Sequence, residues 1–366
     1  MPREERNPRD KTRQAAPVLE DCRGAAENRS PMGAFMGRIH CVLAALALAI
    51  GAPTLAFAQA GAPPITSDPQ TTPPWAYTVL RPGTVAPPDD GKPHQISGSK
   101  ASYTWTQIRD LFSAKDWFPE ERPPMPDIVA GGRKPDVYAC GMCHYPNGQG
   151  KPENASIAGL TAPYIVQQMA DYRNGLRKSS EPRMRPPALM LHLAKHATEE
   201  ETKAAAEYYA KLKYQPWIRI VEADVVPKTE VIIGSMLAPL KEGGTEPIGQ
   251  RIIETAEDLE RVELRDQRVG FVAYVPTGSV KAGEVLANGI GTKTLPCSIC
   301  HGKDLKGIGD VPPLAGRSPT YMFRQLHDIK SGARAGAGAQ LMKAVVENLT
   351  PEDMIALSAY AASMKP

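Results

Sequence analysis

One five-residue pattern, Cys-x-x-Cys-His, occurs twice in this chain of 366 residues and constrains its fold more than any other feature. Residues 140–144 read CGMCH, and residues 297–301 read CSICH. The chain has six cysteines, and the two outside this pattern are Cys22 and Cys41. Most of the cysteines therefore belong to one repeated arrangement, in which a histidine directly follows the second thiol.

The repeat extends well beyond the cysteines. Gly159 follows His144 at the same distance at which Gly316 follows His301. Further matches occur in the same order, at Gly175 and Gly332, at Thr198 and Thr350, and at Tyr208 and Tyr360. Self-similarity of this kind indicates two copies of one structural module. Because the apolar spacing within each copy is helical, we predict a mainly α fold with two related domains.

The sequence outside the two modules divides by composition. Residues 42–50 read VLAALALAI, an apolar run that is short for a membrane span, and the Ala-Phe-Ala at 56–58 is typical of a signal-peptidase site. We expect export and cleavage after Ala58, with an uncleaved anchor as the alternative and with Met32 or Met36 as the true start. The predicted parts are an upstream extension with the signal peptide (1–58), a proline-rich arm (59–101), a first helical domain (102–214), a connector (215–278) and a second helical domain (279–366).

Periodicity and capping residues indicate the elements within these parts. The connector is rich in β-branched and aromatic residues at its two ends, which predicts a small β element. Trp75 and Tyr77 are expected to dock the arm onto a domain. The predicted helices cover 106–115, 161–173 and 198–212, the predicted strands cover 217–223 and 269–275, and helical character returns from Ser279 to the end.

The repeated pattern suits one cofactor in particular. Two cysteines three positions apart on one helical turn reach the two vinyl groups of a haem, and the adjacent histidine then lies beneath the iron. A closed zinc site would need further cysteines in each module, while a thioredoxin-like pair or a structural disulfide leaves the histidine and the repeat unexplained. We therefore predict two covalent haem c groups, attached at Cys140, Cys143, Cys297 and Cys300, with iron bound by His144 and His301.

A methionine in each module is the predicted sixth iron ligand. Met342 precedes the helix start at Thr350 by the same interval by which Met190 precedes Thr198. Met184 is the alternative to Met190, because its distance from Arg177 in the sequence is closer to the distance of Met342 from Arg334. Thioether sulfur favours ferrous iron, and an iron held by both imidazole and thioether has no open position for a substrate.

Other side chains could compete for the iron. His192 and His196 would give bis-histidine ligation, but they follow Met190 close to an acidic helix start and are expected to face solvent. Met322 and Met354 stand at core spacing within helical segments, so we expect them to be packing residues.

Several residues besides the repeated pattern match one known family. They are Pro312–Gly316, Tyr321, Gln325, Gly332, Arg334, Met342 and Tyr360. With them the chain resembles the class I c-type cytochromes, specifically the tandem di-haem periplasmic carriers, over about 135–214 and 279–365. The resemblance implies two class I cytochrome c domains of three to five helices each. It also implies that the carbonyl of Pro312 accepts a hydrogen bond from Nδ1 of His301, a position at which the first module has Ala155.

This resemblance implies periplasmic electron transfer rather than catalysis. The expected partners are a redox protein donor and acceptor, such as a dehydrogenase, a quinol-oxidising complex or a terminal oxidase, and the chain could also be the cytochrome subunit of a dehydrogenase. The alternative is a di-haem peroxidase, in which one iron must lose its sixth ligand. A net charge of +3 gives no indication of nucleic-acid binding, and membrane contact is expected only through an uncleaved N-terminal segment.

Overall fold

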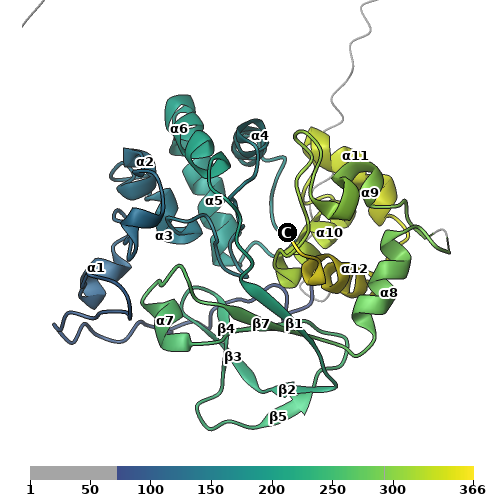
Figure 1. Cartoon of the computed structure of the whole chain (residues 1–366), viewed down its shortest axis with the longest axis horizontal. Coiled ribbons are helices and arrows are strands. Elements are labelled where there is room, and N and C mark those ends of the chain that lie inside the picture. The colour runs from purple at the N-terminus through teal and green to yellow at the C-terminus, as the bar shows by residue number, and fades with distance from the viewer. Residues whose placement is uncertain (1–71, 292) are drawn as a thin grey trace, which may run out of the picture. The chain divides into compact units, whose positions relative to one another are not determined.

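The computed structural model describes residues 72–291 and 293–366, which lie within one compact unit that begins at Ala60. The predicted signal peptide and the first part of the arm fall outside these residues. Helices form the first and last parts of the described chain, and strands fill the middle part (Figure 1). None of the described helices is both long and apolar enough to cross a membrane.

The first helical domain consists of α2 (Asp127–Ala130), α3 (Cys140–His144), α4 (Ala162–Arg173), α5 (Arg185–His196) and α6 (Glu199–Ala210). α4 begins where the Thr161 hydroxyl accepts a hydrogen bond from a backbone N–H of the first turn. α6 begins at a capping box between Thr198 and Glu201, as the sequence predicted. α4 packs against both α5 and α6, and this packing places the short helix α3 beside a helical core.

The helix predicted over 106–115 is wrong in its length. α1 (Trp105–Arg109) has five residues and ends at Asp110, whose backbone is extended. The Asp110 carboxylate accepts a hydrogen bond from the backbone N–H of Phe112, 2.9 Å away. Such a local bond competes with the helical ladder, so the apolar residues after Asp110 pack from a turn. Ile108 still packs as a helical residue and is fully buried.

The second helical domain consists of α8 (Ser279–Ala287), α9 (Ser298–His301), α10 (Pro319–Ser331), α11 (Ala337–Val346) and α12 (Pro351–Ser363). α8 begins at the predicted residue and crosses α12 at very close range (Figure 1). A Cβ atom added at Gly283 would lie 1.9 Å from the carbonyl oxygen of Ala356, so the crossing requires glycine. α12 has its own capping box, formed by Thr350 and Asp353.

The connector contains more β structure than the small element predicted. A sheet with the strand order β1-β7-β6-β4-β3 comprises β1 (Ile218–Glu222), β7 (Phe271–Val275), β6 (Ile253–Ala256), β4 (Met236–Pro239) and β3 (Thr229–Ile232). β2 (Val225–Pro227) pairs with β5 (Thr245–Pro247), and α7 (Leu259–Glu263) precedes β7. β1 and β7 lie where strands were predicted and pair in parallel. The other strands have three or four residues, too few for alternation to be visible in the sequence.

The first residues of the described arm, around Trp75 and Tyr77, lie against α10. The Tyr77 hydroxyl donates a hydrogen bond to Oδ1 of Asp328, 2.7 Å away. The ring centroids of Trp75 and Phe323 are 4.6 Å apart. The expected docking of both aromatic residues is therefore found, and the domain they contact is the second one.

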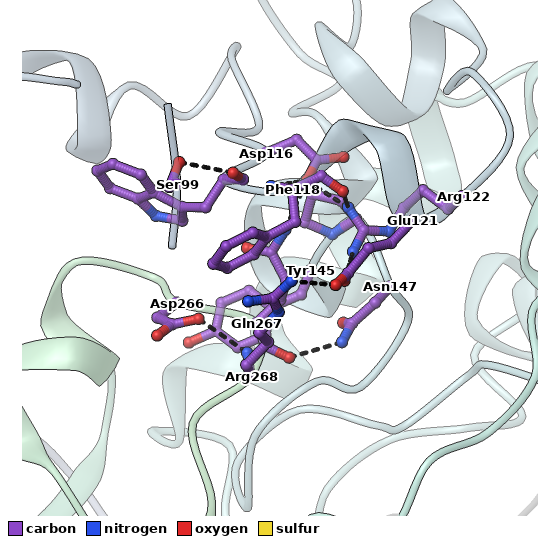
Figure 2. Close-up of polar contacts among 12 residues, drawn as sticks. Ser99, Asp116, Phe118, Glu121, Arg122, Tyr145, Asn147, Asp266, Gln267 and Arg268 are labelled. Atoms are coloured by element: carbon purple, nitrogen blue, oxygen red, sulfur yellow. Dashed lines mark hydrogen bonds and ion pairs between the residues drawn. The ribbon is translucent and has the colours of Figure 1, made fainter. Parts of the chain in front are cut away.

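Polar contacts also join the connector to the first domain (Figure 2). Nδ2 of Asn147 donates to the carbonyl oxygen of Gln267, 2.7 Å away, and the Gln267 amide donates to the carboxylate of Asp116. Arg268 lies over the ring of Phe118. Because Asn147 stands just after α3, the connector fixes the chain where it leaves the first Cys-x-x-Cys-His segment.

Candidate haem-binding sites

The four cysteines of the repeated pattern are free thiols. Burial raises the pKa of the Cys140 thiol to about 12 and that of Cys297 to about 11. Thioredoxin-like pairs need a thiol whose pKa is lowered, because the thiolate is the reactive form. These environments therefore argue against a dithiol redox centre and agree with thiols that are consumed by covalent attachment.

The two histidines make the same hydrogen bond. Nδ1 of His144 lies 2.8 Å from the carbonyl oxygen of Ala155, and Nδ1 of His301 lies 2.8 Å from the carbonyl oxygen of Pro312. A carbonyl oxygen can only accept, so Nδ1 carries the proton and Nε2 keeps its lone pair for a metal. Burial also lowers the pKa of both imidazoles, which favours the neutral form that binds iron.

Both methionines lie in helices, of which α5 was not predicted and α11 falls within the stretch predicted as helical. Met342 lies in α11 and packs, together with Cys297, against the apolar cluster of the second domain. Met190 lies in α5, and Leu193, one turn later on the same helix face, packs in the cluster that contains Cys140. Met184 is fully buried in the cluster of the second domain. The structure therefore separates Met184 from the cluster around Cys140.

Both competing histidines contact backbone carbonyls, and only His196 faces solvent as expected, since His192 is half-buried. His196 is exposed, and its Nδ1 lies 2.9 Å from the carbonyl oxygen of His192. Nε2 of His192 lies 3.2 Å from the carbonyl oxygen of Asp136. Met322 and Met354 are buried, as expected of packing residues.

The surroundings of the second Cys-x-x-Cys-His segment fit a haem. Ile299 lies between the two cysteines and Leu341 directly precedes Met342, yet both side chains are strongly exposed, Leu341 to 80%. Ile290 and Leu295, just before the segment, are exposed as well. Large apolar side chains left exposed beside the cysteines and beside Met342 suit a site that an apolar group covers, and a porphyrin has the apolar area to do so.

The two domains contact each other through a reciprocal set of hydrogen bonds. Nη2 of Arg177 donates to the Tyr321 hydroxyl and to Oε1 of Gln325, at 2.8 and 3.1 Å. The equivalent residue Arg334 donates to the Tyr164 hydroxyl and to Oε1 of Gln168, at 3.0 and 2.9 Å. The backbones of the two arginines form an antiparallel bridge between them. The repeat is thus also an approximate twofold symmetry of the interface.

Two buried arginines near the first site were not found from the sequence. Arg317 and Arg324 belong to the second domain and donate to backbone carbonyls of residues 152–158 in the first domain. A signal existed, because arginine stands where the first module has Leu160 and Gln167. Without the fold, that difference could not be connected to the other module.

Comparisons with known proteins agree with the repeat. Residues 135–213 and 290–365 match the cytochrome c family model. A thiosulfate dehydrogenase electron acceptor from Thiomonas intermedia is 26% identical over 235 residues, covering 63% of this chain and 80% of the relative. Cytochrome c-554(548) from Halomonas halodenitrificans is 35% identical over 89 residues, covering 24% of this chain and 99% of the relative. The solved structure of cytochrome c4 from Pseudomonas stutzeri is 20% identical with a TM-score of 0.40, covering 62% of this chain and 93% of that chain.

Proposed function

This chain belongs to the cytochrome c family and binds haem c covalently, and we propose that it carries single electrons in the periplasm, with each of two haem irons held by one histidine and one methionine. When bound, each haem supplies an iron that changes between ferric and ferrous states. The proposed attachment residues are Cys140, Cys143, Cys297 and Cys300, and the proposed axial ligands are His144, Met190, His301 and Met342.

One observation carries this proposal. Both imidazoles are held by a hydrogen bond from Nδ1 to a backbone carbonyl at 2.8 Å, in the same place of each repeat. This bond fixes the ring orientation and strengthens the imidazole as a donor to a metal. Two identical arrangements in one chain support two similar redox centres rather than one carrier centre and one catalytic centre.

The positions of the methionines support His–Met ligation. Met342 shares an apolar cluster with Cys297, and α5 presents Met190 on the helix face that packs near Cys140. The full burial of Met184 elsewhere supports Met190 over it. With both axial positions taken by the protein, neither iron keeps an open position for peroxide, and this disfavours the peroxidase alternative.

The haem content and ligation can be tested on the matured full chain. A pyridine haemochrome assay should give two covalent haems per chain, and the ferric spectrum should show the weak red band of methionine-ligated iron. Added peroxide should be consumed no faster than by free haem. Faster turnover, or a chain that leaves its export pathway without haem, would contradict the proposal.

Substitution of each methionine tests which of them binds iron. Met190→Ala and Met342→Ala should each open one iron to added cyanide or imidazole and remove half of the red band. Met184→Leu is the matched control and should leave both irons closed. Opening of the first iron by Met184→Leu, with Met190→Ala silent, would exchange the two assignments.

The name shared by two relatives supports a class of partner. Two relatives are called thiosulfate dehydrogenase electron acceptors, and we include in the proposal a periplasmic dehydrogenase of that kind as electron donor. Stopped-flow mixing with a purified thiosulfate dehydrogenase and its substrate should reduce both haems. Reduction no faster than in a mixture without the enzyme would remove this donor and leave the carrier function in place.

A further inference from the structure

The two loops that carry the acceptor carbonyls differ in backbone stiffness, although the hydrogen bonds that they accept from the histidines have the same length. In the second domain the acceptor carbonyl belongs to Pro312, which another proline follows, so the backbone has few alternatives. In the first domain the acceptor is Ala155, between Asn154 and Ser156. A loop without proline has more freedom, yet the bond from His144 is equally short. Something else must hold the first loop.

Two arginines of the second domain donate hydrogen bonds to that loop on both sides of Ala155. Nη1 of Arg317 donates to the carbonyl oxygen of Ser156 at 2.6 Å, and its Nη2 donates to that of Ala158 at 3.3 Å. Nη2 of Arg324 donates to the carbonyl oxygen of Pro152. Hydrogen bonds from a charged donor are about twice as strong as neutral ones. The carbonyls flanking Ala155 are therefore fixed from outside their own domain.

The two guanidinium groups are themselves fixed. Both side chains are buried, with 7% and 4% of their surface exposed for Arg317 and Arg324. The guanidinium of Arg317 lies over the Tyr214 ring, 4.6 Å from its centroid. Nη1 of Arg324 donates to the carbonyl oxygen of Ala76 in the arm, 2.9 Å away. Arg317 is thus positioned by the last residue of the first domain and Arg324 by the arm, and neither of these two contacts involves the loop that the arginines hold.

The support by arginines runs in one direction, although the Thr161 hydroxyl of the first domain donates to Oδ1 of Asp310 in the second loop, 2.6 Å away. At the positions equivalent to Arg317 and Arg324 the first domain has Leu160 and Gln167, neither of which can donate from a guanidinium. The second domain supports its own loop with Pro312 and the proline after it. The arginine contacts are therefore outside the reciprocal symmetry that Arg177 and Arg334 follow.

We propose that Arg317 and Arg324 are positioning residues for the first haem site, which hold the 152–158 loop so that the Ala155 carbonyl orients His144. This inference rests on the proposed function, since it assigns His144 to iron. A hydrogen bond from Nδ1–H to a carbonyl makes the imidazole a stronger electron-pair donor to iron, and this stabilises the ferric state. Loosening the loop should therefore raise the reduction potential of the first haem and leave the second unchanged.

The experiment is a redox titration of the haem-loaded full chain with Arg317→Leu, which puts the residue of the first module at this position. At a fixed applied potential we expect the ferric-to-ferrous ratio of the first haem to fall about tenfold, equivalent to about 59 mV for one electron. The first haem is identified beforehand by the change that Met190→His produces in one of the two waves. Arg251→Leu is the matched control, because Arg251 donates to the carbonyls of Ile248 and Pro247 in the connector.

Rescue separates positioning from a general loss of structure. Adding Ala155→Pro to Arg317→Leu, which restores the backbone constraint of the second loop, should return the first potential to its starting value. Hydrogen exchange of amides 150–159 should speed up in Arg317→Leu and slow again in the double variant. Equal shifts of both haems, no shift, or a shift that Ala155→Pro leaves in place would overturn the inference. A wild-type spectrum without methionine ligation would instead contradict the proposed function.

Discussion

The two haem-binding domains hold their histidines with hydrogen bonds of the same length and support those bonds by different means. The second domain uses backbone stiffness at Pro312, whereas the first uses Arg317 and Arg324, which come from its neighbour. The comparison shows that a repeat can conserve the contact that the chemistry needs while its supporting residues diverge. A domain that supports itself and a domain that is supported from outside should also respond differently to perturbation.

The difference in helix packing gives the largest expected effect. α8 and α12 of the second domain cross at Gly283, while the first helix of the first domain, α2, is only one turn long. Gly283→Ala should destabilise the second domain by about 3 kcal/mol in urea unfolding, because the added methyl group overlaps backbone. Gly338→Ala, where the new Cβ meets nothing within 4 Å, should be neutral or stabilising by up to about 1 kcal/mol. Unchanged hydrogen exchange in α8 and α12 would contradict this account of the crossing.

The reciprocal interface should behave symmetrically, unlike the loops. Arg177→Ala and Arg334→Ala each remove two hydrogen bonds to the other domain, and each should cost about 2 kcal/mol of unfolding free energy. The double variant should lose less than the sum of the two, because the four acceptors form one network. Arg219→Ala, which breaks an exposed ion pair, is the control and should cost less than about 1 kcal/mol. A clear difference between the unfolding free energies lost in Arg177→Ala and in Arg334→Ala would contradict this symmetry.

The pH dependence should also differ between the two loops. Burial raises the pKa of Glu153 to about 7, and Lys151 beside it partly opposes this rise. The folded state therefore binds the proton more tightly than the unfolded state. This stabilisation is complete below pH 4.5 and is lost as the pH rises through about 7, which amounts to a loss on the order of 3 kcal/mol.

Glu153→Gln should flatten the stability profile between pH 4.5 and 7. Asp310 occupies the equivalent position in the second domain and is exposed, so Asp310→Asn should leave the profile unchanged. Thermal unfolding measured across this pH range would show the difference. A slope that survives Glu153→Gln would assign the titration to another buried group.

The helix caps should give the smallest effect and the closest agreement between the domains. Thr198 and Thr350 form the same capping box at the start of α6 and α12. Thr198→Ala and Thr350→Ala should each cost about 1 kcal/mol, measured by urea unfolding. Serine at either position should restore most of the loss. If only one of the two alanine substitutions destabilises the protein, tertiary packing must fix the start of the other helix.

Local signals predicted the parts of the fold that depend on local bonds. The helix start near Thr161, the cap at Thr198 and the start of α8 lie where the sequence indicated, and the acceptor at Pro312 is the one that the family resemblance implied. The helix α5 was missed, since it opens with two prolines, whereas α11 forms within the stretch predicted as helical although it contains Gly338. Prolines are tolerated in a first helical turn, and packing compensates for an interior glycine.

Long-range contacts account for what the sequence did not reveal. Nothing near Arg317 or Arg324 in sequence indicates that their partners lie in the other repeat, because those partners are backbone carbonyls. The extent of the sheet was missed for a related reason, since strands such as β3 and β4 become recognisable only once they pair. The two Cys-x-x-Cys-His segments could be recognised in the sequence, whereas the contacts of Arg317 and Arg324 could not.

The placement of α10 has a consequence for how the protein is made. Because a chain is synthesised from its N-terminus, the first Cys-x-x-Cys-His segment emerges long before residues 317–324. The loop around Ala155 can reach its final form only when the C-terminal half has arrived. The N-terminal half produced by itself would therefore be a different cytochrome from the one it becomes within the whole chain.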